Sequence, residues 1–252
     1  MMSPMHLIFP LILHLIFPAA VSAVIQLPGG ESFSAESTYC ESWRLAVETY
    51  NAGTWYGIPK KCQDYVVAYL TGEQYDSDYE TAVDYAIDFA KTVKISGDGK
   101  DAWIFDVDET LLTNIDYYKA HGYGSEPYNE ESFNEWVETG AAPAFDASLR
   151  LYSELKKIGF AIIILTGRDE EQRSITEKNL GDAGYSGWSR LILRGPENKG
   201  KSATIFKSGE RSELIKKGYR IHGSIGDQWT DLLGFPVAER SFKVPNPMYY
   251  VP

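Results

Sequence analysis

The spacing of apolar residues changes character near residue 97. Before that point, over about residues 34–95, apolar residues recur at intervals of three and four, which is typical of amphipathic helices. The clearest apolar face consists of Ala82, Val83, Ala86, Phe89, Ala90 and Val93. Shorter helices are expected over residues 41–50 and 64–70, after an extended leader over residues 24–33. This part of the chain is therefore predicted to be a helical N-terminal region.

After the turn-rich sequence Gly97-Asp98-Gly99, short apolar runs alternate with helical stretches. Strands are expected over residues 102–107, 160–165, 190–194 and 220–225, and helices over residues 146–158, 169–181 and 208–217. This alternation is typical of βαβ units, in which helices cover both faces of a parallel sheet. Residues 162–165 are all apolar, as expected of a strand buried on both sides. The predicted fold class is α/β, with a Rossmann-like parallel sheet.

Three of the expected strands lead into residues with carboxylate or hydroxyl side chains. Asp106-Val107-Asp108-Glu109-Thr110 closes the first, Thr166-Gly167-Arg168 follows the second, and Gly226-Asp227-Gln228-Trp229-Thr230-Asp231 follows the last. In a parallel sheet, ligands bind beyond the carboxyl ends of the strands. The sequence therefore predicts that these three segments meet at one end of the sheet.

The aspartates of these segments form an oxygen-rich set. Asp106 and Asp108 are two positions apart in an extended segment, so their side chains are expected on the same side. Two close carboxylates repel each other unless a proton or a divalent cation lies between them. With Asp227 and Asp231 they suit Mg²⁺, which favours carboxylates, waters and substrate phosphate. A calcium-binding EF-hand is the competing interpretation, but it requires glycine where this chain has Leu111.

The same residues can transfer a phosphoryl group. An aspartate can attack phosphorus once the charge on the phosphoryl group is neutralised, which makes Asp106 the candidate nucleophile. Asp108 can protonate the leaving oxygen and later activate water. Thr166, the Gly167 N–H and a nearby lysine can donate hydrogen bonds to the phosphoryl oxygens.

The histidines and cysteines of the chain do not fit the other common phosphatase mechanisms. Beyond residue 23 the chain has two histidines, His121 and His222, and neither lies in the Arg-His-Gly setting of a histidine nucleophile. Two histidines are also too few for a dinuclear metallophosphatase. No cysteine lies in a Cys-x5-Arg loop. Aspartate chemistry is what remains.

The formal net charge of −11 narrows the range of partners. An acidic surface repels nucleic-acid backbones, so no nucleic-acid partner is expected. A small phosphate site stays possible, because a bound cation and backbone N–H groups create a local positive field.

The first 23 residues contain no Lys, Arg, Asp or Glu, and residues 7–20 are mostly apolar. They end in Val21-Ser22-Ala23, a small-residue pattern suited to signal peptidase. The alternative is a membrane anchor, but prolines and a short apolar core disfavour a spanning helix. We therefore expect a signal peptide over residues 1–23, a route through the secretory pathway, and no membrane attachment after its removal.

The two cysteines, Cys40 and Cys62, are expected to form a disulfide if the chain follows this oxidising route. The alternative is a pair of buried free thiols. No Asn-x-Ser/Thr sequence occurs, so N-linked sugars are not predicted.

Several separated motifs, taken in order, resemble those of the haloacid dehalogenase superfamily. They are a hydrophobic strand with Asp-Val-Asp-Glu-Thr-Leu-Leu, then Ile-Ile-Leu-Thr-Gly-Arg, then Gly-Asp-Gln-Trp-Thr-Asp. Within the superfamily the chain is similar to the plant acid phosphatase and vegetative storage protein group over about residues 34–252. That similarity includes Gly218-Tyr219-Arg220-Ile221 and Phe242-Lys243-Val244-Pro245-Asn246-Pro247.

The resemblance implies a magnesium-dependent acid phosphatase that hydrolyses phosphomonoesters. It assigns a phospho-aspartyl intermediate to Asp106 and an acid/base role to Asp108, whose backbone carbonyl would also contact Mg²⁺. It further implies that Asp227 binds the metal and that Asp231 is a further, water-bridged ligand. The resemblance also implies an acid optimum, which fits a mechanism in which Asp108 starts protonated.

The resemblance also assigns the substrate-binding residues. Thr166 matches the second motif, beside Gly167. The third motif is a lysine ahead of the last helix, where Lys207 fits best and Lys201 is the runner-up. The same resemblance raises an alternative function, because some storage-type members lack the nucleophilic aspartate. This chain retains that aspartate, which favours activity without excluding storage.

The stretch over about residues 113–145 separates the first two motifs and is rich in aromatic residues. By position it is expected to form a small cap insert over the strand ends. Most of its rings are expected in a satellite core, with one or two lining the substrate entrance. The predicted organisation is then a signal peptide, a helical region over residues 24–96 and a phosphatase core over residues 97–252. A phosphotransferase activity, an extracellular or vacuolar destination, and a homo- or hetero-dimer stay open.

Overall fold

The structure is a computed structural model, and it describes residues 35–252. The expected signal peptide over residues 1–23 and the expected leader over residues 24–33 lie outside the described residues. No helix within residues 35–252 is both long and apolar enough to cross a membrane.

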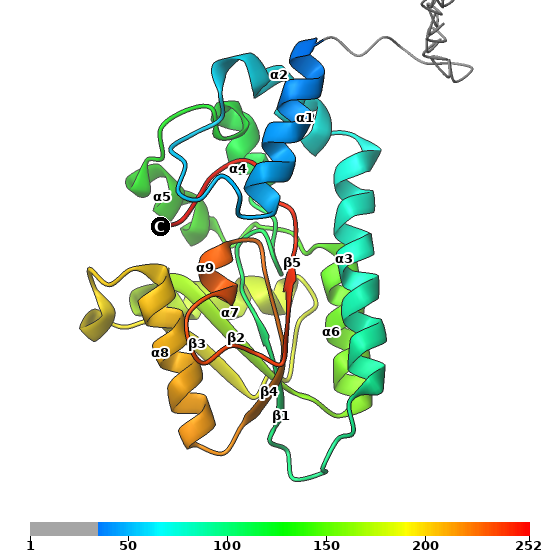
Figure 1. Ribbon diagram of the computed structural model, residues 1–252. Coiled ribbons are helices and arrows are strands. Elements are labelled where there is room, and N and C mark those ends of the chain that lie inside the picture. Colours follow the sequence, from blue (N-terminus) through cyan, green and yellow to red (C-terminus); the bar gives the residue numbers. More distant parts are fainter. Residues whose placement is uncertain (1–34) are drawn as a thin grey trace, which may run out of the picture. The chain divides into compact units, whose positions relative to one another are not determined.

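Five parallel strands form one sheet in the order β3-β2-β1-β4-β5 (Figure 1). Their bounds are β1 Asp101–Phe105, β2 Ala161–Asp169, β3 Arg190–Arg194, β4 Arg220–Gly226 and β5 Arg240–Lys243. The first four strands and the α/β fold class confirm the predictions. The last strand, β5, is not predicted, because this short edge strand buries only Phe242 and lacks an apolar run.

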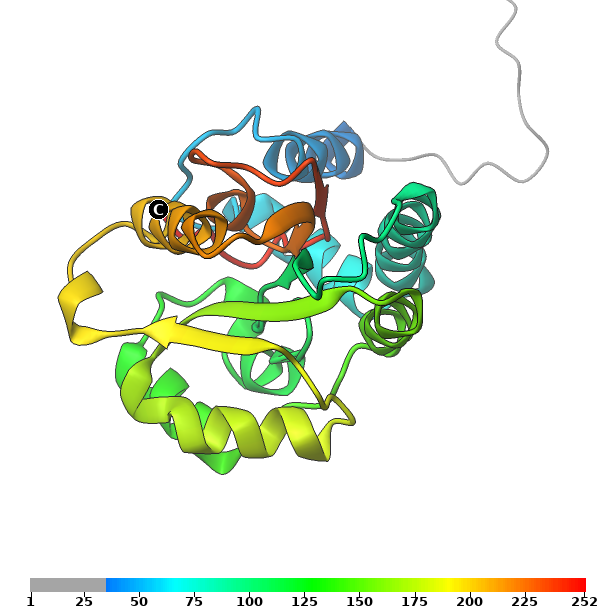
Figure 2. The same cartoon turned by 90° about the horizontal axis from the view of Figure 1, so that it is seen from below.

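Helices cover both faces of the sheet (Figure 2). They are α3 Glu73–Thr92, α6 Asp146–Ile158, α7 Arg173–Asp182, α8 Ala203–Lys216 and the short α9 Trp229–Leu232. Successive residues of a strand point to opposite faces, so the central strands feed two cores. In β1, Trp103 and Phe105 join the core on the side of α3 and α6, whereas Ile104 packs with Phe206 of α8. This arrangement explains the continuous apolar run predicted for the central strand β2.

The helical N-terminal region consists of α1 Ala35–Glu48, α2 Gln63–Leu70 and α3. The predicted apolar face of α3 is confirmed, because Val83, Ala86 and Ala90 are fully buried. A disulfide joins Cys40 of α1 to Cys62, which directly precedes α2, as expected. The disulfide therefore ties the first two helices together.

The insert between the first two motifs contains α4 Ile115–Ala120 and α5 Glu130–Thr139. The Asn129 side chain caps α5 by accepting a hydrogen bond from the Ser132 N–H, and the helix ends at Gly140, which has a left-handed φ of 61°. Tyr117 and Tyr118 are buried. Tyr123, Phe133, Trp136 and Phe145 are partly buried against the same core, so most of the insert's rings pack in a core, as predicted.

The last long helix, α8, begins earlier than predicted. Ser202 caps it by accepting a hydrogen bond from the Ile205 N–H, so the helix starts at Ala203 rather than at residue 208. Lys207 therefore lies one turn inside the helix instead of at its start. This register turns Lys207 toward the sheet, where the residue is 4% exposed.

Candidate active site

A cavity of about 450 Å³ lies beyond the carboxyl ends of β1, β2 and β4. The predicted site residues that line it are Asp106, Asp108, Gly167, Lys207, Asp227 and Asp231. Asp106 is the first residue after β1, and its N–H donates to the Ile225 carbonyl of β4. The three predicted segments therefore meet at one end of the sheet.

Lys207 links two of the buried aspartates. Its Nζ lies 2.5 Å from Asp106 Oδ1 and 2.5 Å from Asp231 Oδ1, and all three residues are buried. Lys201 lies elsewhere, with its Nζ donating to Asn198 Oδ1 at 2.9 Å. Of the two candidate lysines, the structure brings only Lys207 to Asp106.

The charges of this cluster perturb one another. Burial and the neighbouring Asp231 raise the pKa of Asp106 well above its usual range, although Lys207 opposes that change. Burial disfavours the charged form of Lys207, but Asp106 and Asp231 outweigh it and raise the pKa of the lysine. One ammonium group is thus shared between two carboxylates.

Asp106, Asp227 and Asp231 form a group that fits a divalent cation. Each offers a carboxylate oxygen, and these oxygens lie within 4.8 Å of one another. Burial, followed by the charges of Asp231 and Glu109, raises the pKa of Asp227 to about 8. Three buried carboxylates outnumber the one lysine between them, and oxygen ligands of this kind suit hard cations.

A hydrogen bond within the motif Gly226–Asp231 fixes the position of the Asp231 side chain. The Gln228 N–H donates to Asp231 Oδ2 at 2.9 Å, which brings the carboxylate toward the strand end. A side chain at Gly226 would place its Cβ 2.3 Å from Asp231 Oδ2. The glycine of this motif is therefore required for Asp231 to reach the site.

The Asp108 side chain lies apart from this group and is paired with Arg168. Arg168 Nη2 lies 2.7 Å from Asp108 Oδ1, and Arg168 Nε lies 3.0 Å from Asp108 Oδ2. Asn114 Nδ2 also donates to Asp108 Oδ1 at 2.9 Å. Burial disfavours the charge, but Arg168 and Asn114 outweigh it and lower the pKa of Asp108. The carboxylate is therefore ionised in this arrangement and lies outside the group of three carboxylates that fits a cation, and the contact of the Asp108 backbone carbonyl with the metal stays a prediction.

The two predicted donors of the second motif differ in access. Gly167 is exposed and lines the cavity. Thr166 is fully buried, and its hydroxyl accepts a hydrogen bond from the Arg168 N–H at 3.2 Å. The contact of Gly167 with a phosphoryl group fits this geometry better than that of Thr166.

Two buried arginines have defined partners near the cavity. Arg168 faces Asp108 rather than solvent. Arg211 donates to the carbonyls of Asp231 and Pro236, at 2.8 and 2.6 Å, and thereby holds the loop after α9 instead of pairing with a carboxylate. Arg168 thus fixes the Asp108 side chain, and Arg211 fixes the backbone that follows Asp231.

Sequence reasoning missed a set of polar residues around these aspartates, namely Glu109, Asn114, Gln228, Asn246 and Tyr249. Glu109 is fully buried, has a left-handed φ of 53°, and accepts a hydrogen bond from the Tyr249 hydroxyl at 2.6 Å. Glu109, Gln228 and Asn246 lie within the motifs quoted for the family resemblance, which is the signal that could have drawn attention to them.

Aromatic residues surround the cavity mouth. Tyr118, Tyr128 and Phe133 come from the insert, and Tyr249 and Tyr250 from the end of the chain. More rings of the insert line the entrance than the one or two expected. Rings from these two segments therefore line the same cavity as the site aspartates.

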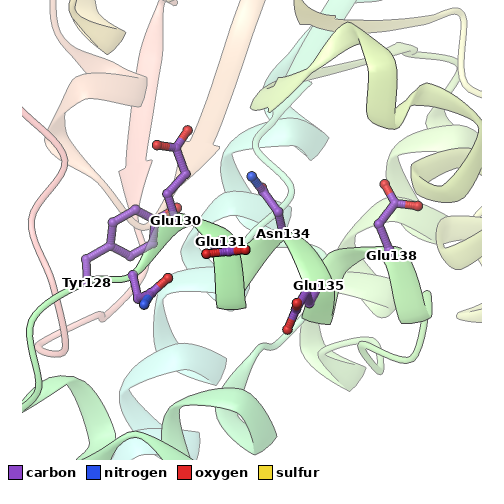
Figure 3. A pocket seen from close by; sticks show the side chains of 7 residues that line it. Tyr128, Glu130, Glu131, Asn134, Glu135 and Glu138 are labelled. Carbon is purple, nitrogen blue, oxygen red and sulfur yellow. The ribbon is translucent and has the colours of Figure 1, made fainter.

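A second, open hollow of about 980 Å³ adjoins the mouth along α5 (Figure 3). Its lining includes Glu130, Glu131, Glu135 and Glu138, and Glu130 also lines the main cavity. Negative charge on this side of the mouth disfavours the approach of polyanions.

The fold and the residues that line the cavity together indicate a class of enzyme. A buried aspartate lies at a strand end, a lysine pairs with it, and two further buried carboxylates complete a group that fits a divalent cation. Such an arrangement suits enzymes that transfer phosphoryl groups through an aspartate. Residues 30–252 match the family described as HAD superfamily, subfamily IIIB (acid phosphatase), and the chain belongs to this family. The predicted family and enzyme class, a phosphoric monoester hydrolase, are confirmed.

Relatives in plants agree with this assignment. The chain is 47% identical to acid phosphatase 1 of Solanum lycopersicum over 236 residues, which cover 94% of this chain and 91% of the relative. It is 44% identical to the stem 28 kDa glycoprotein of Glycine max, with 84% of each chain covered. It is 40% identical to vegetative storage protein 2 of Arabidopsis thaliana, covering 91% of this chain and 86% of the relative.

Among solved structures, the class C acid phosphatase from Bacillus anthracis has the same fold. The two structures have a TM-score of 0.62 at 22% sequence identity, with 75% of this chain and 85% of that chain covered. This likeness confirms the fold, while the family match carries the assignment of function.

Proposed function

We propose that this acid phosphatase hydrolyses small phosphomonoesters with Mg²⁺, through a phospho-aspartyl intermediate on Asp106. The observation that carries the proposal is the position of Asp106 at the end of β1, where its carboxylate lines the cavity and Lys207 holds one of its oxygens. Because Lys207 binds Oδ1, Oδ2 is the oxygen available to attack phosphorus.

Asp227 and Asp231, together with Asp106, are proposed to hold the Mg²⁺ ion. The three buried carboxylates support this assignment. When bound, the ion supplies positive charge that neutralises the carboxylates and the phosphoryl oxygens. The exposed Gly167 backbone and Lys207 are proposed to donate hydrogen bonds to the remaining phosphoryl oxygens.

Asp108 is proposed to move the protons. As the bond from Asp106 to phosphorus forms and the bond to the leaving oxygen breaks, Asp108 donates a proton to that oxygen. Water then attacks the phosphorus of the acyl phosphate, Asp108 takes the proton, and Asp106 is regenerated.

The pairing with Arg168 means that Asp108 must take up a proton before the first step. The negative charge of an arriving phosphoryl group raises the pKa of a nearby carboxyl group. A low pH favours the same protonation, which accords with an acid optimum.

A solved relative supports an oxyanion site in this fold. The class C acid phosphatase from Bacillus anthracis has also been solved with tungstate bound, with a TM-score of 0.60 to this chain. Tungstate is a tetrahedral oxyanion, as phosphate is. We expect the cavity beside Asp106 to accept an oxyanion of this shape.

The test is hydrolysis of an aryl phosphate with and without Mg²⁺, comparing the wild type with Asp106→Asn. We expect metal-dependent turnover by the wild type and a loss of at least about a thousandfold in the variant. Asp182→Asn is the matched control, because Asp182 is exposed and pairs only with Lys178 among the described residues. A wild type without metal-dependent turnover would refute the proposal, and products formed with added alcohols would reveal phosphotransfer instead.

Storage is the second candidate function, because relatives at 40% and 39% identity are named vegetative storage proteins. The retained Asp106 and its contact with Lys207 favour catalysis as well. Turnover in the assay above, compared with the abundance of the protein in tissue, would separate a working enzyme from a reserve with incidental activity.

We also propose that the chain enters the secretory pathway and reaches the vacuole or the exterior. The disulfide between Cys40 and Cys62 supports this route, because such bonds persist in oxidising compartments. A fluorescent fusion carrying residues 1–23 would test it, and a cytosolic signal would contradict it.

A further inference from the structure

The segment after β5 lies against the candidate metal ligand Asp227. Asn246, in this segment, is 2% exposed, and its Nδ2 donates to Asp227 Oδ2 at 2.7 Å. Gln228 Nε2 donates to the same oxygen, also at 2.7 Å. The ionised form of Asp227, which is the form that binds a cation, can only accept hydrogen bonds, so both amides present their NH₂ groups to it.

Each amide is fixed by a second contact to the same segment. Asn246 Oδ1 accepts from the Met248 N–H at 2.9 Å, and Gln228 Oε1 accepts from the Val251 N–H at 3.0 Å. Neither amide can flip without losing a hydrogen bond at both ends. The two donors therefore define one orientation of the Asp227 carboxylate.

This orientation leaves the other oxygen of Asp227 available. Among the described residues, the only side-chain donor to Oδ1 is Thr110 Oγ1, at a long distance of 3.4 Å. The two oxygens are thus distinct: Oδ2 holds two short hydrogen bonds, whereas Oδ1 has the free capacity that a cation requires.

The asparagine is itself anchored by the helical N-terminal region. The Asn246 N–H donates to Glu48 Oε1 at 2.9 Å, and Lys243 Nζ lies 2.6 Å from Glu48 Oε2. Glu48 is the last residue of α1, and the C-terminal segment, drawn in red, passes near that helix (Figure 1). A chain of contacts thus runs from α1 through Asn246 to Asp227.

The same segment also forms one wall of the cavity, through Tyr249, Tyr250, Val251 and Pro252. Residues 246–252 thus contain both the amide that contacts Asp227 and four residues that line the cavity. The end of the chain is therefore part of the site rather than an appendage to the sheet.

We infer that Asn246 is a positioning residue, which turns the Asp227 carboxylate so that its Oδ1 is presented to the divalent cation. The inference rests on the proposed function, because it takes Asp227 as a ligand. Residues that hydrogen-bond to metal ligands typically change metal affinity by about 10- to 100-fold when they are removed.

The test measures Mn²⁺ binding to the metal-free full-length protein by electron paramagnetic resonance, in which bound ions lose the signal of the free ion. We expect Asn246→Ala to raise the Kd for Mn²⁺ by about tenfold or more. Asn179→Ala is the matched control, because Asn179 is 3% exposed and its Nδ2 donates to the Ala142 carbonyl at 2.7 Å. The Asn179→Ala variant loses a similar buried hydrogen bond that does not involve Asp227, so its Kd for Mn²⁺ should equal that of the wild type.

A second variant, Asn246→Ser, separates loss of the contact with Asp227 from misfolding of the Asn246→Ala protein. Asn246→Ser keeps a small polar side chain that is too short to reach Asp227, and it should raise the Kd in the same way. High Mg²⁺ should restore most of the turnover of both Asn246 variants but none of that of Asp106→Asn.

A folded Asn246 variant that binds Mn²⁺ as tightly as the wild type would overturn the inference. So would an equal loss of affinity in Asn179→Ala, because that result would indicate a general effect of stability. If the wild type binds Mn²⁺ but does not turn over aryl phosphate, the proposed function fails while the positioning role of Asn246 stands.

Discussion

At the scale of single residues, the site depends on one ammonium group placed between two carboxylates. Lys207 lies 2.5 Å from both Asp106 and Asp231 and is buried with them. Removing one partner from a buried ion pair costs more than the pair itself contributes, because the remaining charges are left uncompensated. The lysine is thus important both for folding and for the proposed chemistry.

We predict that Lys207→Ala loses at least about a hundredfold in turnover, because an ammonium group beside the phosphoryl oxygens is removed. In metal-free buffer its free energy of unfolding should fall by about 3 kcal/mol. Aryl phosphate hydrolysis and urea unfolding measure the two effects. Lys201→Ala is the comparison, and it should resemble the wild type, because Lys201 contacts Asn198 rather than Asp106. Equal losses in the two variants would contradict the assignment.

Single residues also explain what sequence could and could not predict about the site. The aspartates were predictable, because strand ends and quoted motifs locate them, whereas the resemblance narrowed the lysine only to Lys207 with Lys201 as the runner-up. The pairing of Asp108 with Arg168 was not, because it joins residues 60 positions apart that only the sheet order makes neighbours. The role of Asn246 was missed because its amide reaches Asp227 from a loop with no periodic pattern, although the residue itself lies in a quoted motif.

At the scale of elements, the opposite end of the sheet is held by a network at the start of β1. Asp101 is 2% exposed, and it accepts hydrogen bonds from Arg220 Nε at 2.8 Å and from the Ser96 N–H at 2.7 Å. These contacts, with Arg220 as the largest cause, lower the pKa of Asp101 below its usual range. The network thus joins β1 to β4, where Arg220 lies.

Because its pKa is lowered in the folded state, Asp101 makes the free energy of unfolding depend on pH. A carboxyl group with a lower pKa in the folded state stabilises the fold above its unfolded pKa of about 4, and this contribution is lost as the pH falls through the folded pKa. We predict that Asp101→Asn is destabilised by about 2 kcal/mol near pH 6, and that the difference from the wild type narrows below about pH 4. Urea unfolding across this range measures it, and a difference that widens toward acid would contradict it.

The disulfide acts at the same scale, between α1 and the start of α2. Closing a loop between Cys40 and Cys62 stabilises a fold by about 3 kcal/mol. We predict that the double variant Cys40→Ala, Cys62→Ala loses about this much free energy of unfolding. At temperatures where it stays folded and at high Mg²⁺, it should keep its turnover, because neither cysteine lines the cavity. Loss of turnover in the folded variant would show that the disulfide serves the site directly.

Element boundaries show where sequence patterns have limits. The buried central strands were predictable from their apolar runs, whereas β5 was not, because an edge strand needs only one face and Phe242 alone supplies it. The start of α8 was misplaced because its cap, Ser202, is a single polar residue without a distinctive context.

At the scale of the whole molecule, an acidic protein holds a small phosphate site. The net charge is −11, and glutamates of α5 lie beside the cavity mouth. Local positive charge comes from Lys207 and from the cation that the aspartates fit. This balance favours small phosphomonoesters over polyanions, in agreement with the class of enzyme to which the chain belongs.

The central claim is that Asp106 carries the phosphoryl group. The most direct measurement is acid-quenched peptide mass spectrometry of the Asp108→Asn variant during turnover of an aryl phosphate. An aryloxide leaving group needs little protonation, so this variant should still form the intermediate, but it lacks the base that activates water and should hydrolyse the intermediate slowly. We predict a phosphoryl adduct on the peptide that contains Asp106, and none when Asp106→Asn is added. An adduct on another residue, or one that persists in the double variant, would contradict the account.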